Sequence, residues 1–173
     1  ASDVYKRQVF SRLVDAFKNT SEMDVKSNYL TALSLVSKHI SSNLIEPYMN
    51  EMLPLLLQSL DMPNSEVKVS ALNTLLDTCE KFHQLITEHV QTLSRSLLKL
   101  VLPVSYNSVS VRVLALRMLE TLTHVVPLNH LLPFKEDIID GLLPVLDDKK
   151  RIVRKQCVGT RQAYFELGQV PFE

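Results

Sequence analysis

Apolar residues recur along this chain at intervals of three and four, which places them on one face of an α-helix. From Val67, for example, the series continues through Ala71, Leu72 and Leu75, and a similar series begins at Val111. Short polar segments separate these stretches, and short connections make successive helices antiparallel neighbours. The pattern predicts four helix hairpins, over residues 4–17 with 24–40, 45–60 with 65–82, 85–102 with 108–125, and 134–146 with 149–167.

Each predicted hairpin carries the same motif, a valine followed by a basic residue near the start of its second helix. The four copies are separated by 42, 44 and 42 residues: Val25-Lys26, Val67-Lys68, Val111-Arg112 and Val153-Arg154. A period of about 40–47 residues with two helices per unit is typical of HEAT and armadillo repeats. We therefore expect an all-α, HEAT-type right-handed α-solenoid of four antiparallel helix pairs. Its repeats are predicted at approximately 4–43, 44–83, 84–130 and 131–168, within a single domain over 1–173.

The basic residues of this motif are interpreted as structural rather than ligand-binding. We expect them to form a buried or half-buried ladder with polar residues of the turns, namely Asp61, Asn107 and Asp147. Prolines within or beside the first helices are expected to bend them, because proline removes a helical hydrogen bond. These are Pro54, Pro103 and Pro144, and Gly168 is predicted to end the last helix.

The last repeat departs from the other three at one core position. Arg161 occupies the place that Leu33, Leu75 and Leu119 hold in the earlier repeats. An arginine there predicts that no fifth repeat covers this face, because terminal repeats of a solenoid have a polar outer side. The first helix, in contrast, carries more apolar residues than one stripe requires. The chain is therefore expected to be the C-terminal piece of a longer solenoid.

Composition narrows the function classes. The chain is 46% hydrophobic and 22% charged with zero net charge, so no overall field would attract DNA or an anionic membrane. Its longest apolar runs are far shorter than the roughly 20 residues of a membrane helix. Two cysteines cannot form a secreted disulfide framework, which favours a reducing compartment. The five histidines lack metal-ligand spacing and the three glycines are isolated, so we expect neither a cofactor nor an enzyme.

One charge cluster stands out at the start of the last predicted helix. Basic residues there oppose the helix dipole at a cost of about 0.3–1 kcal/mol each, which favours a functional interpretation of the cluster. The alternative interpretation is a solvated helix start whose charge is balanced by Asp147 and Asp148. Arginine and aromatic residues follow on the same helix, and both are enriched at interface hot spots. The predicted partner-binding surface comprises Lys149, Lys150, Arg151, Arg154, Lys155, Arg161, Tyr164 and Phe165, with Arg117 and Glu120 beside it.

The segment from Leu142 to Gly168 contains the string Leu-Pro-Val-Leu-Asp-Asp-Lys-Lys-Arg-Ile-Val-Arg-Lys, followed by Arg161, Tyr164-Phe165 and Leu167-Gly168. This string resembles the C-terminal end of the methyl-methanesulfonate-sensitivity nineteen (Mms nineteen) family. That family is the HEAT-repeat scaffold of the cytosolic iron–sulfur protein targeting complex. The repeat over Ser110 to Leu122 also fits, although other HEAT repeats share its pattern.

The resemblance implies a non-catalytic scaffold that binds no cluster itself. It would dock a small cytosolic iron–sulfur assembly factor and, through it, a WD-repeat propeller, and so help deliver clusters to cytosolic and nuclear apoproteins, including DNA-maintenance enzymes. Direct contact with nucleic acid or a membrane is not expected. The repeats alone leave open another HEAT adaptor, such as a transport or phosphatase scaffold. A nucleic-acid-binding surface on the basic cluster is the less favoured alternative, because no aromatic residues interleave with it.

Overall fold

The structure is a computed structural model that describes residues 2–169, without the side chains of Ser2, Asp3 and Ser42. All regular elements within this described range are helical, and no strand occurs in it, which confirms the all-α class. Contacts divide the chain into two compact units, unit 1 (Ala1–Leu85) and unit 2 (Ile86–Glu173). The division falls close to the predicted boundary between the second and third repeats. The superhelical hand and the single-domain assignment stay predictions.

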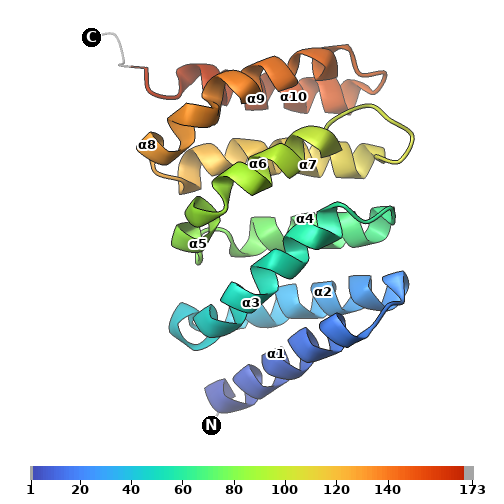
Figure 1. Cartoon of the computed structure of the whole chain (residues 1–173), viewed down its shortest axis with the longest axis vertical. Coiled ribbons are helices and arrows are strands. Elements are labelled where there is room, and N and C mark those ends of the chain that lie inside the picture. Colours follow the sequence, from blue (N-terminus) through green and yellow to red (C-terminus); the bar gives the residue numbers. More distant parts are fainter. Residues whose placement is uncertain (1, 170–173) are drawn as a thin grey trace. The chain divides into compact units, whose positions relative to one another are not determined.

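Unit 1 contains two helix hairpins. The first pairs α1 (Ser2–Asn19) with α2 (Met23–His39), and the second pairs α3 (Ser42–Leu60) with α4 (Ser65–Thr78). The second helices, α2 and α4, lie side by side, and so do the first helices, α1 and α3 (Figure 1). Large apolar side chains with no more than 1% exposure fill the space between these layers: Phe10, Phe17, Leu30, Leu33, Leu56 and Leu72.

Unit 2 also contains two hairpins, but their first arms are broken into short helices. The boundary between the units lies within α5 (His83–Glu88), and the third arm contains α6 (Val90–Leu100), which packs on α7 (Val109–Val125). The fourth arm comprises α8 (Leu128–Leu131), the 3-10 turn η1 (Leu132–Phe134), α9 (Lys135–Gly141) and the 3-10 turn η2 (Leu143–Asp147). This arm packs on α10 (Arg151–Glu166), which lies beside α7 (Figure 1).

The prediction of one continuous helix over 85–102 and another over 134–146 was therefore wrong. His89 has φ −105° and ψ 12°, outside the helical range, and it separates α5 from α6. Pro144 stands at the start of η2, where a ring without an N–H favours a tight turn over a continued α-helix. Of the prolines expected to bend helices, Pro54 lies inside α3, whereas Pro103 follows α6 in the connection to α7.

The long period of the sequence corresponds to a repeated contact between second helices. The Thr74 hydroxyl of α4 donates to the Leu30 carbonyl of α2 at 3.3 Å, 44 residues away. The Thr160 hydroxyl of α10 donates to the Leu116 carbonyl of α7 at 2.9 Å, again 44 residues away. Each unit thus contains the same register between stacked helices. Residues separated by one repeat length meet across this contact, which is why the motif recurs at that spacing.

Candidate functional site

Three of the four basic residues of the ladder, Lys26, Lys68 and Arg112, are buried. Lys26 is 9% exposed; its ammonium group donates to the Phe17 carbonyl at 2.9 Å and lies 4.3 Å from the centre of the Phe17 ring. Lys68 is 3% exposed, and burial lowers its pKa while the nearby Asp61 carboxylate opposes that shift. These observations support the structural interpretation of Lys26 and Lys68, and the charge of the nearby Asp61 favours the protonated form of Lys68.

The third member of the ladder joins the two hairpins of unit 2. The Arg112 guanidinium donates from Nη1 to the Asn107 carbonyl at 2.6 Å and from Nη2 to Asp148 Oδ1 at 3.2 Å. Its Nε also lies 2.8 Å from Asp148 Oδ2, so the two side chains form a buried ion pair with one hydrogen bond. The predicted ladder included Asn107 and Asp147, and Arg112 does bond Asn107 through its carbonyl. The Asp147 side chain is exposed, however, and the buried acidic residue of the ladder is Asp148, so this part of the prediction was wrong by one residue.

Four of the five clustered basic residues are exposed at the start of α10. Lys149, Lys150, Arg151 and Lys155 project into solvent. Arg154 is half-buried instead, and its Nη1 donates to the Asp148 carbonyl at 2.7 Å. The structure therefore separates a structural arginine from a group of exposed cations, which we call the α10 basic cluster (Lys149, Lys150, Arg151 and Lys155).

The start of α10 lacks the N-cap hydrogen bond that α4 and α7 have. Asn64 accepts a hydrogen bond from the Val67 amide at the start of α4, and Ser108 accepts one from the Val111 amide at the start of α7. The equivalent residue of α10 is Lys150, whose side chain has no acceptor and makes no cap. Replacing such caps costs about 0.5–2 kcal/mol. The basic residue at this position is therefore not explained by helix stability.

Tyr164 does not belong to the predicted surface. Its side chain is fully buried, and its hydroxyl donates to the Leu119 carbonyl of α7 at 2.6 Å. Burial raises the pKa of this phenol well above its ordinary value. The helix spacing explains the difference, because Tyr164 shares the inward face of α10 with Val153, Cys157 and Thr160. The residue is a core contact between the stacked helices of unit 2.

The end of α10 retains two of the predicted surface residues. Phe165 is 38% exposed, and the Arg161 guanidinium lies 4.8 Å from the centre of its ring. Arg161 is half-buried, and its Nε donates to the Ile139 carbonyl of α9 at 3.3 Å. Arg161 thus contributes to the packing of the fourth hairpin while covering part of the Phe165 ring.

The two neighbouring candidates on α7 differ in exposure. Arg117 is exposed. Glu120 is half-buried, and its Oε2 accepts a hydrogen bond from Gln156 Nε2 of α10 at 3.4 Å. Arg117 could therefore meet a partner directly, whereas Glu120 also holds α7 to α10.

Sequence reasoning missed two apolar residues on the solvent side of α10. Ile152 and Val158 are each 59% exposed. The repeat length offered a signal for Ile152, because the equivalent positions in the other second helices hold Asp24, Glu66 and Ser110. An isoleucine at a position that is otherwise polar is informative when it lies beside exposed cations.

The two cysteines are buried free thiols in different units. Burial is the largest cause that raises the pKa of Cys157, to about 11, and the nearby Arg161 charge only partly offsets it. Burial also raises the pKa of Cys79.

Over the part of the chain that the structure describes, no group of three or more His, Cys, Asp or Glu residues is placed to hold a metal ion. Helices in the same range include none long and apolar enough to cross a membrane.

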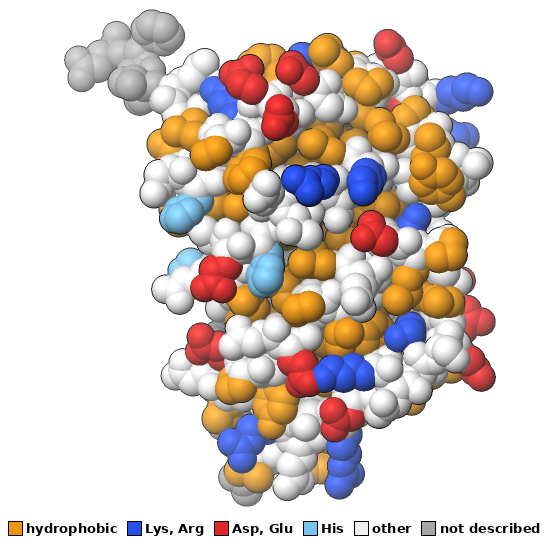
Figure 2. All heavy atoms as spheres, in the orientation of Figure 1, with side chains coloured by type: hydrophobic (Ala, Val, Ile, Leu, Met, Phe, Trp, Pro, Cys, Tyr) orange, Lys and Arg blue, Asp and Glu red, His pale blue; other side chains and the backbone are white. Residues whose placement is uncertain are grey.

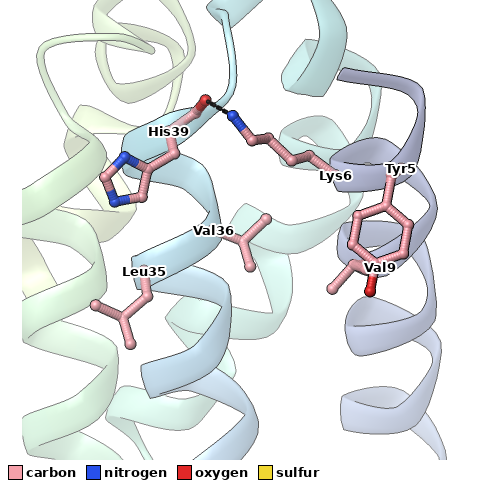
Figure 3. A pocket seen from close by; sticks show the side chains of 6 residues that line it. All are labelled: Tyr5, Lys6, Val9, Leu35, Val36 and His39. Atoms are coloured by element: carbon pink, nitrogen blue, oxygen red, sulfur yellow. Dashed lines mark hydrogen bonds between the residues drawn. The ribbon is translucent and has the colours of Figure 1, made fainter. Parts of the chain in front are cut away.

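Surface hollows occur in the described part of unit 1. A largely apolar pocket of about 320 Å³ lies between α1 and α2, lined by Tyr5, Lys6, Val9, Leu35, Val36 and His39. Figure 3 shows the Lys6 side chain reaching the His39 carbonyl, a hydrogen bond of 3.2 Å. A second hollow of about 210 Å³ follows the α2–α4 contact and contains the Ser34–Asp77 hydrogen bond of 2.6 Å. On the face drawn in Figure 2, charged side chains of both signs are interspersed with apolar ones.

Comparison with known proteins places this chain in a family. Residues 5–123 match the family model described as RNAPII transcription regulator C-terminal, which is more than half of the chain. The chain belongs to the MMS19 family. The MMS19 DNA repair/transcription protein of Saccharomyces cerevisiae is 60% identical over 165 residues, which is 95% of this chain and 16% of that protein. The MMS19 nucleotide excision repair protein homolog of Homo sapiens is 38% identical over 156 residues, 90% of this chain and 15% of that protein.

These matches confirm the resemblance stated from the sequence, although the family model ends before the string at Leu143–Lys155 on which it rested. The match to the yeast protein extends over nearly the whole chain. The chain spans about a sixth of the length of these MMS19 relatives. The names of these relatives associate them with DNA repair and, for the yeast protein, with transcription.

Proposed function

We propose that this chain is a non-catalytic docking region of an MMS19-type scaffold. It docks a small cytosolic iron–sulfur assembly factor and, through it, a WD-repeat propeller. The scaffold thereby helps deliver iron–sulfur clusters to client apoproteins in the cytoplasm and nucleus, including DNA-maintenance enzymes. Membership of the MMS19 family supports the proposal, and the association of its relatives with DNA repair is consistent with such clients.

The α10 basic cluster is the observation that carries this proposal. Four exposed cations stand at the start of one helix, where the dipole disfavours positive charge and where α4 and α7 have neutral caps. Arg154, their neighbour in the sequence, is not counted with them because its side chain donates to the Asp148 carbonyl. Exposed basic side chains that weaken the start of α10 are explained if a partner of negative charge binds there. We therefore place the docking surface for the assembly factor on the α10 basic cluster, with Arg117 and Phe165 at its edge.

The test is a calorimetric titration of the purified assembly factor into this chain. Reversing the charge at Lys149, Lys150 and Lys155 together is expected to weaken binding more than tenfold, because each of the three ammonium groups is exposed and none holds the fold. The matched control reverses Arg7, Arg12 and Lys99, which are also exposed and lie outside the fourth hairpin. The control carries the same change in net charge.

Equal loss of affinity in the two triple variants would show that only net charge matters. Unchanged affinity in the first variant would place the docking surface elsewhere. Circular dichroism of each variant checks that the helices remain, and a rise in the dissociation constant with salt is expected only for proteins that retain the cluster.

A further inference from the structure

Tyr106 is exposed on a turn that hydrogen bonds fix to the end of α6. The residue is 63% exposed and lies in the connection between α6 and α7. Its neighbour Asn107 is only 2% exposed, and Asn107 Nδ2 donates to the carbonyls of Lys99 at 2.9 Å and Leu102 at 3.1 Å. These bonds fix the turn to the end of α6. The large aromatic side chain of Tyr106 is thus exposed at a defined place.

Arg112 brings this turn next to the start of α10. One guanidinium reaches both the Asn107 carbonyl, at 2.6 Å, and Asp148 Oδ1, at 3.2 Å. The turns before α7 and before α10 consequently lie side by side at the same end of unit 2 (Figure 1). Tyr106 directly precedes Asn107, and Lys149 directly follows Asp148, so the exposed aromatic residue and the exposed cation flank the same buried bridge.

A second large apolar side chain lies at this end of the unit. Ile152 is 59% exposed in the first turn of α10, between Arg151 and the buried Val153. We call Tyr106, Lys149, Lys150, Arg151 and Ile152 the turn-end surface. It combines three exposed cations with two exposed apolar side chains, and every member lies within unit 2.

We propose that the turn-end surface binds a short acidic segment of a partner protein that also carries apolar side chains. Carboxylates of the segment pair with the three cations, and its apolar residues pack on Tyr106 and Ile152. Tyrosine is a frequent hot-spot residue, while surrounding charges act mainly on association rate and specificity. The inference rests on the proposed docking role of the fourth hairpin and specifies the chemistry of the partner.

The composition of the surface favours a peptide over a nucleic acid. Single-stranded nucleic acids use a continuous positive groove with several aromatic residues on which successive bases stack. The turn-end surface offers one aromatic residue, and the exposed carboxylate of Asp147 interrupts its positive charge. A short segment with a few carboxylates and apolar side chains fits both features.

The test measures fluorescence anisotropy of a labelled twelve-residue peptide in which Asp and Glu alternate with Leu and Phe. We expect saturable binding to this chain, and a loss of roughly tenfold in affinity for Tyr106→Ser combined with Ile152→Ser. The control variant combines Tyr5→Ser with Leu35→Ser, which removes side chains of 69% and 56% exposure from unit 1. The control is expected to bind the peptide as the original chain does, and Tyr106→Phe should do the same.

Three results would overturn the proposal. These are no binding of the peptide, equal binding of a peptide with Ser in place of Leu and Phe, or displacement of the peptide by a twelve-nucleotide single strand that binds more tightly. The assay contains no assembly factor, so its outcome is independent of the calorimetric test. Failure to bind the assembly factor, with peptide binding intact, would count against the proposed function alone.

Discussion

The buried ion pair between Arg112 and Asp148 provides the sharpest test of how the fourth hairpin is held. Substituting Asp148→Ala removes both carboxylate oxygens that face the guanidinium, at 2.8 and 3.2 Å. It also removes the oxygen that accepts the Lys150 amide at 2.8 Å, at the start of α10. The perturbation therefore acts on one contact between α7 and the last hairpin and on one helix start.

The expected loss of unfolding free energy in Asp148→Ala follows from the burial of the ion pair. The Asp148 side chain has no exposure and the Arg112 side chain 10%, so the remaining guanidinium would be left in a poorly hydrated site. Removing one partner of a buried ion pair costs about 3–5 kcal/mol. Replacing both partners with apolar residues, as in Arg112→Met with Asp148→Leu, leaves no unpaired charge and is expected to recover at least half of this loss.

The measurement is urea unfolding followed by circular dichroism, with hydrogen exchange to locate the change within unit 2. Asp147→Ala is the matched control, because this neighbouring carboxylate is exposed and exposed substitutions change stability by about 0.5 kcal/mol or less. Exchange should accelerate in α7 and α10 of the Asp148→Ala protein and stay unchanged in α1 and α2. If both alanine variants lose equally little free energy of unfolding, the ion pair does not hold the hairpin as described.

Three further predictions concern single residues of unit 2. Thr160→Val removes the hydroxyl that donates to the Leu116 carbonyl, and urea unfolding should show a loss of about 0.5–1.5 kcal/mol, because this carbonyl lies within α7 and keeps its helical hydrogen bond. Gly168→Ala should lower the free energy of unfolding by about 1 kcal/mol, since Gly168 has φ +78° and alanine resists that conformation; Gly159→Ala, in α10, should not destabilise the chain. The raised pKa of Cys157 means that the unfolded chain loses this proton first, so unfolding free energy should fall between pH 9 and about 11, less steeply in Cys157→Val.

The second helices were the part of the fold that the sequence predicted best. Each carries small and large apolar residues at helical spacing, so α2, α4, α7 and α10 lie close to their predicted ranges. The first arms of the third and fourth hairpins were mispredicted because their apolar pattern continues through breaks. The His89 backbone conformation and the turn at Pro144 are local effects that apolar periodicity does not register.

The candidate surface was predicted in part. The exposure of Lys149, Lys150, Arg151 and Lys155 agrees with their place outside the apolar stripe. The burial of Tyr164 was available from the same stripe, because it follows Val153, Cys157 and Thr160 at intervals of four, three and four. The choice between Asp147 and Asp148 as the partner of Arg112 was not available, because it depends on the path of a turn. Nor was the link between the turn at Asn107 and the residue before α10, which the long-range bridge through Arg112 produces.

The measurement that tests the central claim most directly is a hydrogen-exchange footprint of the assembly factor on this chain. If the fourth hairpin is the docking site, adding the factor should slow exchange in peptides covering residues 147–155, where the α10 basic cluster lies. Exchange in α1, α2 and α3 should stay as it was. Protection confined to unit 1, with residues 147–155 unchanged at saturating factor, would contradict the account.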